Sequence, residues 1–178
     1  MQTTGSFGRS WSIRMDEPQT ESARPAPEWS LPDRLRLPAN SRVLDFLCDA
    51  RPSAHSDVAE VLVRAARCVD GVRCCCPDPA RYAYVVAYRP DARIIGLAFG
   101  LSGIAFRLPS HRVRAALLAG GTPELELGSE WVRFAPWVEG ESGAETLGRL
   151  VDWCRIAAGT DGLPGRPTAM NGRLEGDG

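Results

Sequence analysis

The most apolar stretch of the chain runs from Tyr82 to Pro109, and turn residues interrupt it twice. Apolar side chains alternate along Tyr82–Tyr88 on both faces, which is typical of a β-strand covered on both sides. The connections at 89–92 and 100–103 are short and rich in turn residues, so the strands that they join must be antiparallel neighbours. The stretch therefore predicts three strands of an antiparallel meander: Tyr82–Tyr88, Arg93–Phe99 and Ile104–Leu108.

Two helices and a short strand are predicted before the meander. The first helix, Ser41–Ala50, has an apolar face and follows Asn40, a residue type that favours the N-cap position. Asp57 and Glu60 have the spacing of a capping box at the start of the second helix. A strand at Val72–Cys76 should then lead into the meander.

A helix, a hairpin and a final helix are predicted after the meander. Ser110 is the expected cap of His111–Ala119, and Ser142 with Glu145 has the spacing of a capping box for the last helix. The resulting order, ααββββαββα, predicts an α+β fold with helices covering one face of a mostly antiparallel sheet. The two strands expected in the hairpin are Leu125–Leu127 and Trp131–Trp137.

Composition divides the chain into one α+β domain, 39–159, and two tails. Residues 1–38 are rich in Ser, Thr, Pro and charge, which predicts a disordered N-terminal tail. Residues 160–178 are rich in Gly and predict a flexible C-terminal tail. The M-D-E-P sequence at Met15 leaves open whether Met1 or Met15 is the true start.

Charge and hydropathy exclude some classes of partner. The net charge is −1 and all 21 basic residues are Arg, so no overall basic field favours nucleic acid or an anionic membrane. No run approaches the roughly 20 apolar residues that span a bilayer. The first residues lack the apolar centre of a secretory signal. We therefore expect a cytoplasmic protein with no membrane partner, in which the six cysteines are thiols.

The second half of the chain resembles the YjbR and TfoX N-terminal-like group of small bacterial domains. The resemblance covers about residues 72–158 and is carried by the strand Tyr82–Tyr88, the G-L-A-F-G-L-S-G-I-A-F-R-L-P strand pair, and the W-V-R-F strand beginning at Trp131. It implies a small α+β domain whose fold has been compared with DNA-binding domains, and it carries over no catalytic residue. The cysteine triplet and the long N-terminal tail depart from the group.

A cluster of basic residues surrounds the start of the predicted helix His111–Ala119. The free N–H groups and positive dipole end of a helix N-terminus attract anions, and Arg binds them in a bidentate manner. The alternative is a solvated surface where these Arg side chains pair with nearby Glu and Asp. The candidate anion-binding residues are Arg107, His111, Arg112 and Arg114.

The sequence Cys74-Cys75-Cys76 is the most unusual local feature. Cys74 and Cys76 should share one face of their strand, so they are weak candidates for metal binding. Zinc requires four ligands, and the others would have to come from distant Cys and His residues. The alternatives are small buried hydrophobes, or a redox-sensing thiol exposed beside Arg73.

Aromatic residues of the hairpin are expected in the core. Trp131 and Trp137 should share one face of their strand, with Phe134 on the other. Such residues pack in cores more often than they stack on bases.

Enzymatic chemistry is not favoured by the sequence. His55 and His111 are the two histidines, neither lies in a recognised catalytic motif, and no phosphate-binding loop occurs, so no cofactor is predicted. The leading hypothesis is a non-enzymatic protein-interaction module that engages its partner through a sheet face or through the N-terminal tail with Trp11 and Trp29. The alternatives are an anion- or nucleic-acid-binding domain that uses the Arg/His cluster, and a metal or redox role of the cysteine cluster.

Overall fold

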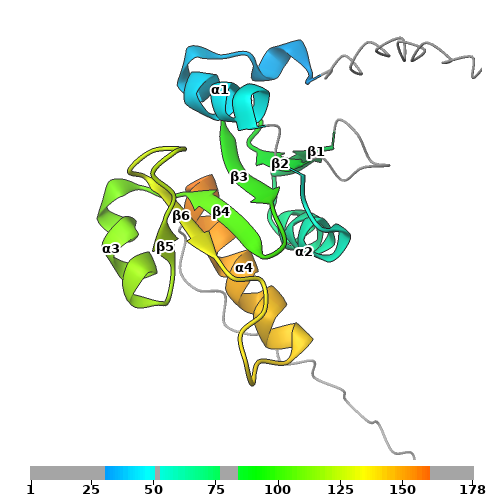
Figure 1. Cartoon of the computed structure of the whole chain (residues 1–178), viewed down its shortest axis with the longest axis vertical. Coiled ribbons are helices and arrows are strands. Elements are labelled where there is room, and N and C mark those ends of the chain that lie inside the picture. The colour runs from blue at the N-terminus through cyan, green and yellow to red at the C-terminus, as the bar shows by residue number, and fades with distance from the viewer. Residues whose placement is uncertain (1–30, 51–52, 77–83, 161–178) are drawn as a thin grey trace, which may run out of the picture.

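The computed structural model describes residues 31–50, 53–76 and 84–160, which form an α+β domain (Figure 1). Its six-stranded antiparallel sheet has the strand order β1-β2-β3-β4-β6-β5. The predicted meander is confirmed, because the first four strands are neighbours in chain order. Residues 1–30 of the predicted tail 1–38, with Trp11, Met15 and Trp29, lie outside the described residues. So do residues 161–178 of the predicted tail 160–178, and the start of the strand at Tyr82. The strands are β1 Arg73–Cys75, β2 Val85–Tyr88, β3 Ile94–Phe99, β4 Gly103–Arg107, β5 Thr122–Pro123 and β6 Trp131–Phe134.

The helices agree with the predicted order, but three of the predicted N-caps differ. Ser142 and Glu145 form the predicted capping box of the last helix. The second helix is capped by His55, whose Nδ1 accepts from the Asp57 backbone N–H at 3.3 Å. Pro109 occupies the N-cap position of the third helix, so Ser110 lies in its first turn. The helices are α1 Ser41–Ala50, α2 Ser56–Arg67, α3 Ser110–Leu118 and α4 Gly143–Ala158, with 3-10 helices η1 Asp33–Leu35 and η2 Pro38–Asn40.

One face of the sheet packs against α2 and α4 (Figure 1). The strands contribute Val85, Ile104 and Phe106, and the cluster extends through Phe134, whose ring stacks on Trp153 with 4.9 Å between ring centroids. These side chains are aliphatic or aromatic, so burial of apolar surface stabilises this layer. The buried helix residues include Val58, Leu62, Ala65, Leu150, Val151 and Cys154.

The opposite face is also covered, by η1, η2 and α1. Leu35, Val43 and Leu47 pack there against the strand side chains. The sequence placed the helices on one face, whereas the structure has them on both. The two apolar faces predicted for Tyr82–Tyr88 explain the second cover. A register shift between Ala87 and Tyr88 lets Ile94 and Leu97, three residues apart, lie on this second face. The strand residues are Tyr84, Val86, Tyr88, Ile94, Leu97, Ala105 and Trp131.

Asn40 joins the N-terminal cover to the sheet. It is fully buried in η2, where it is not an N-cap. Its Nδ2 donates to the carbonyls of Leu35 and Ala92, each at 2.8 Å, and its Oδ1 accepts from the Ile94 N–H at 3.0 Å. Because Leu35 is also buried, the packed part of the chain begins before residue 39, where the sequence placed the domain boundary.

The predicted hairpin is displaced towards its N-terminal side. The strand that pairs with β6 is Thr122–Pro123, and residues 124–128 form a helical turn in which Gly128 N–H donates to the Glu124 carbonyl. Gly128 has a φ of 134°, which favours glycine. Arg42 of α1 binds the carbonyls of Leu125 and Glu126, which a ladder would otherwise use.

Candidate binding site

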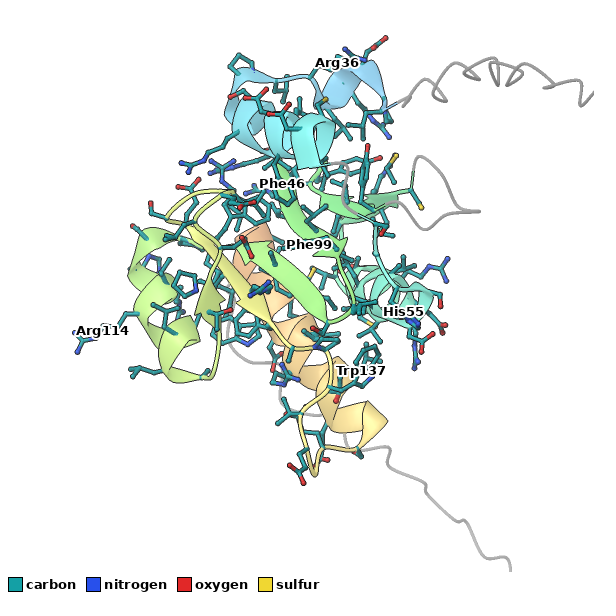
Figure 2. All side chains as sticks on the ribbon, viewed as in Figure 1. Arg36, Phe46, His55, Phe99, Arg114 and Trp137 are labelled. Atoms are coloured by element: carbon teal, nitrogen blue, oxygen red, sulfur yellow. The ribbon has the colours of Figure 1, made fainter. Side chains whose placement is uncertain are left out.

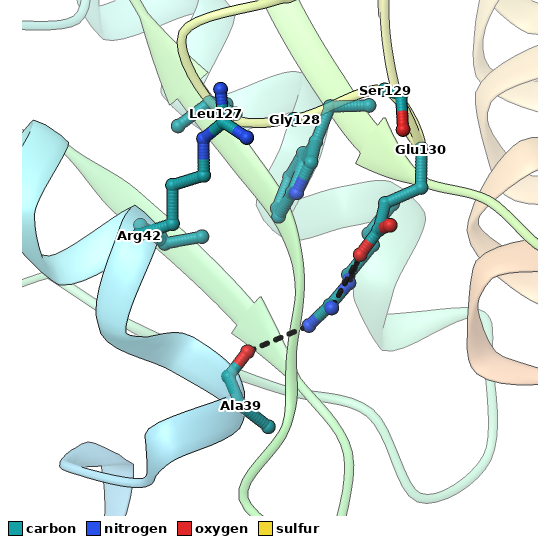
Figure 3. A pocket seen from close by; sticks show the side chains of 9 residues that line it. Ala39, Arg42, Leu127, Gly128, Ser129 and Glu130 are labelled. Atoms are coloured by element: carbon teal, nitrogen blue, oxygen red, sulfur yellow. Dashed lines mark hydrogen bonds and ion pairs between the residues drawn. The ribbon is translucent and has the colours of Figure 1, made fainter.

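A cavity of about 110 Å³ opens where α1 meets the end of the β4–β6 pair (Figure 3). Its floor is apolar, since Val43, Leu127 and the indole of Trp131 are all buried. Charged side chains from α1, β4 and the loop before β6 also line the cavity. The other lining residues are Ala39, Arg42, Arg107, Gly128, Ser129 and Glu130.

Arg107, one of the predicted anion-binding residues, lies in this lining and already has partners. Its Nε donates to Glu130 Oε1 at 2.6 Å, and its Nη2 pairs with the same oxygen. Its Nη1 donates to the Ala39 carbonyl at 2.9 Å, shown as a dashed line in Figure 3. The side chain is 16% exposed. Arg107 therefore links the sheet to the N-terminal cover, and Glu130 balances its charge.

Arg42 is the second cation of the cavity, and it is held in place by backbone groups. Its Nε donates to the Glu126 carbonyl at 3.0 Å and its Nη2 to the Leu125 carbonyl at 2.6 Å. Within the described residues no carboxylate lies within ion-pair distance of it. The cavity thus contains two guanidinium groups and one carboxylate.

The remaining predicted anion-binding residues lie on α3 and do not line this cavity. His111, Arg112 and Arg114 are exposed, and Arg114 points away from the domain (Figure 2). Arg107 ends β4 while these three residues follow Pro109, so the predicted cluster is divided between the cavity and the outer surface of α3.

The cysteine triplet alternates between the two faces, as predicted. Cys74 and Cys76 pack against the α2/α4 side, and Cys75 packs against the side of α1. Burial raises the pKa of the Cys74 thiol to about 11 and also raises that of Cys75, so both thiols are protonated at neutral pH. Within the described residues no three Cys, His, Asp or Glu side chains are grouped to hold a metal. This environment fits small, partly buried hydrophobes.

The two histidines lie at opposite ends of β4. His55 N–H donates to the Gly100 carbonyl, just before β4, whereas His111 follows the end of that strand. Five extended residues separate these ends by roughly 17 Å. Neither histidine therefore shares a site with the other, and the cavity contains neither.

Three exposed apolar side chains, from Leu101, Trp137 and Val138, lie at the end of the sheet opposite the cavity and are named the apolar patch. Leu101 is 79% exposed, and Trp137 and Val138 are 48% and 47% exposed. The β4–β6 register, which pairs Ile104 with Phe134, brings the turn before β4 and the segment after β6 to one end of the sheet. Figure 2 shows Trp137 at this end, with His55 towards the same side. The expectation that Trp137 shares a buried strand face with Trp131 is wrong, because β6 stops at Phe134.

The sequence did not identify Arg42, Glu130 or Trp137 as members of a site. Arg42 is one of 21 arginines, and its partners lie more than 80 residues away. The W-V-R-F-A-P-W sequence contained one usable signal, since Pro136 argues against a strand that continues to Trp137.

Comparison of the chain with protein-family models, with curated proteins and with solved structures finds no match. No helix of the described segments combines the length and apolar character required to cross a bilayer.

Proposed function

We propose that this protein is a non-enzymatic protein-interaction module of the bacterial cytoplasm, related to the YjbR and TfoX N-terminal-like group. The apolar patch of Leu101, Trp137 and Val138 carries the proposal. Single exposed apolar residues are common, but several that two loops bring to one end of a sheet are typical of contact surfaces. Retention of all six cysteines as thiols supports a reducing compartment.

The composition of the patch favours a protein as the partner. Trp is the residue type most enriched among those that dominate binding energy at protein interfaces. The patch joins one tryptophan ring to two aliphatic side chains. A partner that meets it presents an apolar surface, as protein interfaces do, whereas duplex nucleic acid presents charged phosphates.

The charged cavity also supports binding rather than catalysis. Its volume of about 110 Å³ is below the several hundred Å³ that enclose a drug-sized ligand. The lining contains one serine but no histidine beside it that could act as its base. One small polar group of a partner is the ligand that this geometry supports best.

Affinity capture with the full chain tests the proposal. Wild-type protein and the double variant Leu101→Ser, Trp137→Ser are used as baits in cytoplasmic extract, and retained proteins are quantified by mass spectrometry. We expect a defined set of proteins to be retained by the wild type and depleted at least about tenfold by the variant, equivalent to about 1.4 kcal/mol.

Leu118→Ser is the matched control. Leu118 is 81% exposed, comparable with Leu101, but lies on α3. This variant should retain the same proteins as the wild type. Identical retention by all three baits would overturn the assignment of the patch. If the wild type retains nucleic acid and no defined set of proteins, the partner is not a protein.

A further inference from the structure

We infer that the cavity between α1 and the β4–β6 pair binds a single carboxylate group. The assignment of this group to a protein, as an acidic side chain or a C-terminus, rests on the proposed function. The ligand chemistry itself follows from the charge, the preorganised donors and the size of the cavity.

The charge of the cavity selects a monoanion. Arg107 and Glu130 neutralise each other through their ion pair, and Arg42 contributes one further positive charge. A monoanion leaves the cavity neutral. A phosphate dianion would leave the cavity with one excess negative charge. The Glu130 carboxylate in the same lining would repel it.

The guanidinium of Arg42 is fixed before any ligand arrives. Two of its N–H groups are used by the carbonyls of Leu125 and Glu126, which define its plane. Nη1 is not used by either bond. Preorganised donors lose less conformational entropy on binding, and a guanidinium matches the geometry of a carboxylate.

Gly128 keeps the space between Arg42 and the apolar floor open. A Cβ atom at this position would lie 3.5 Å from Trp131 Cδ1 and 3.7 Å from Arg42 Nη1. Without it, the indole edge and the guanidinium face the same space. Figure 3 shows Arg42 and Leu127 on one side of this space and Glu130 on the other.

The size and floor of the cavity complete the description of the ligand. A cavity of about 150 Å³ accommodates benzene in a protein interior, so about 110 Å³ suits a carboxylate with a short aliphatic stem. Val43, Leu127 and Trp131 can contact the stem while Arg42 binds the oxygens. A nucleotide or a sugar is too large.

The experiment uses acetate as the probe and the ¹⁵N-labelled full chain. Sodium acetate replaces sodium chloride at constant ionic strength, while NMR follows the indole N–H of Trp131 and the side-chain N–H groups of Arg42. We expect saturable shifts of both. Sodium phosphate at the same ionic strength should bind at least about threefold more weakly.

Two variants test the role of charge in different ways. Arg42→Gln removes the cation, and Ser129→Asp adds a competing carboxylate at the rim while leaving Arg42 and its backbone bonds intact. Both should reduce the affinity for acetate at least about fivefold, whereas Arg114→Gln on α3 should leave it unchanged. The inference is overturned by the absence of saturable shifts in the wild type, by unchanged affinity in Ser129→Asp, or by tighter binding of phosphate.

The source of the carboxylate is tested separately by repeating the affinity capture with Ser129→Asp. Loss of the wild-type protein set is expected. If Ser129→Asp retains that set although the wild type binds acetate, the carboxylate does not come from a protein partner. The proposed function would remain in place. If the double variant Leu101→Ser, Trp137→Ser retains the wild-type protein set, the proposed function is overturned and the acetate result still stands.

Discussion

The two faces of the sheet are covered by different means. On the α2/α4 face, the contacts are between apolar side chains such as Leu62, Leu150 and Phe106. On the other face, Leu35, Val43 and Leu47 provide apolar contact, but polar side chains bind backbone groups across the layer. Apolar packing tolerates small shifts, whereas hydrogen bonds of this kind set one position. The second cover is therefore held at one position, and the cavity lined by Arg42 and Arg107 lies along its boundary with the sheet.

The contact between Arg34 and Tyr88 illustrates the polar attachment. The guanidinium lies over the tyrosine ring, 5.1 Å from its centroid, and donates to the phenol oxygen. This cation–π geometry anchors η1 to β2. Three successive parts of the cover are thus attached by polar side chains. Arg34 binds β2, Asn40 binds the start of β3, and Arg42 binds the loop before β6.

The largest effect is expected from an apolar truncation on the α2/α4 face. Leu150 is fully buried, so Leu150→Ala should lower the free energy of unfolding by about 3 kcal/mol, through lost burial and the cavity left behind. Urea denaturation followed by circular dichroism measures it. Hydrogen exchange should accelerate on both faces together. The exposed control Leu118→Ala should change stability by less than about 0.5 kcal/mol. An equal effect of both variants would contradict the apolar description of this face.

A smaller and more local effect is expected from Asn40→Ala. This change leaves Ala92 C=O and Ile94 N–H without the Asn40 side chain as partner, while Leu35 C=O keeps the Leu37 N–H, at a cost of about 2 kcal/mol. Hydrogen exchange should accelerate in α1 before it does in α4, because the cover loses its attachment. If α4 loses protection at the same rate as α1, the two covers are not separate units.

The smallest effect is expected from Ser142→Ala, which removes the exposed N-cap of α4, one of the two helices that cover the apolar face. Loss of the N-cap hydrogen bond to the α4 backbone should cost about 1 kcal/mol at neutral pH. The bonds from Ser142 also hold the pKa of Glu145 below its usual 4.5, so the ionised carboxylate stabilises the folded state above that pH. This contribution is lost as pH falls through the lowered pKa.

Urea titrations of wild type and Ser142→Ala between pH 7 and pH 2.5 measure this dependence. The difference in stability between the two proteins should shrink as the pH falls through the pKa of Glu145. A difference that stays constant over the whole range would mean that the bond from the Ser142 hydroxyl to the Glu145 carboxylate does not contribute to stability.

Local patterns in the sequence predicted the secondary structure better than they predicted the site. The meander and the Ser142–Glu145 box depend on neighbours in the chain, and both are confirmed. Asn40 had the right residue type for a cap, yet its partners include a carbonyl 52 residues away. Arg107 was expected to face an anion, but the β4–β6 register places Glu130 beside it. Such contacts follow from tertiary packing, which no local pattern encodes.

The buried position of Leu35 has a consequence for the order in which this protein is made. The cover, residues 31–50, leaves the ribosome before the strands that it covers, β2 to β4 and β6, which are synthesised 35 or more residues later. Contacts across such separations form late because the intervening chain must first be closed. The earliest part of the domain to be translated should therefore be among the last to reach its place. Until then, Leu35, Val43 and Leu47 remain available to chaperones.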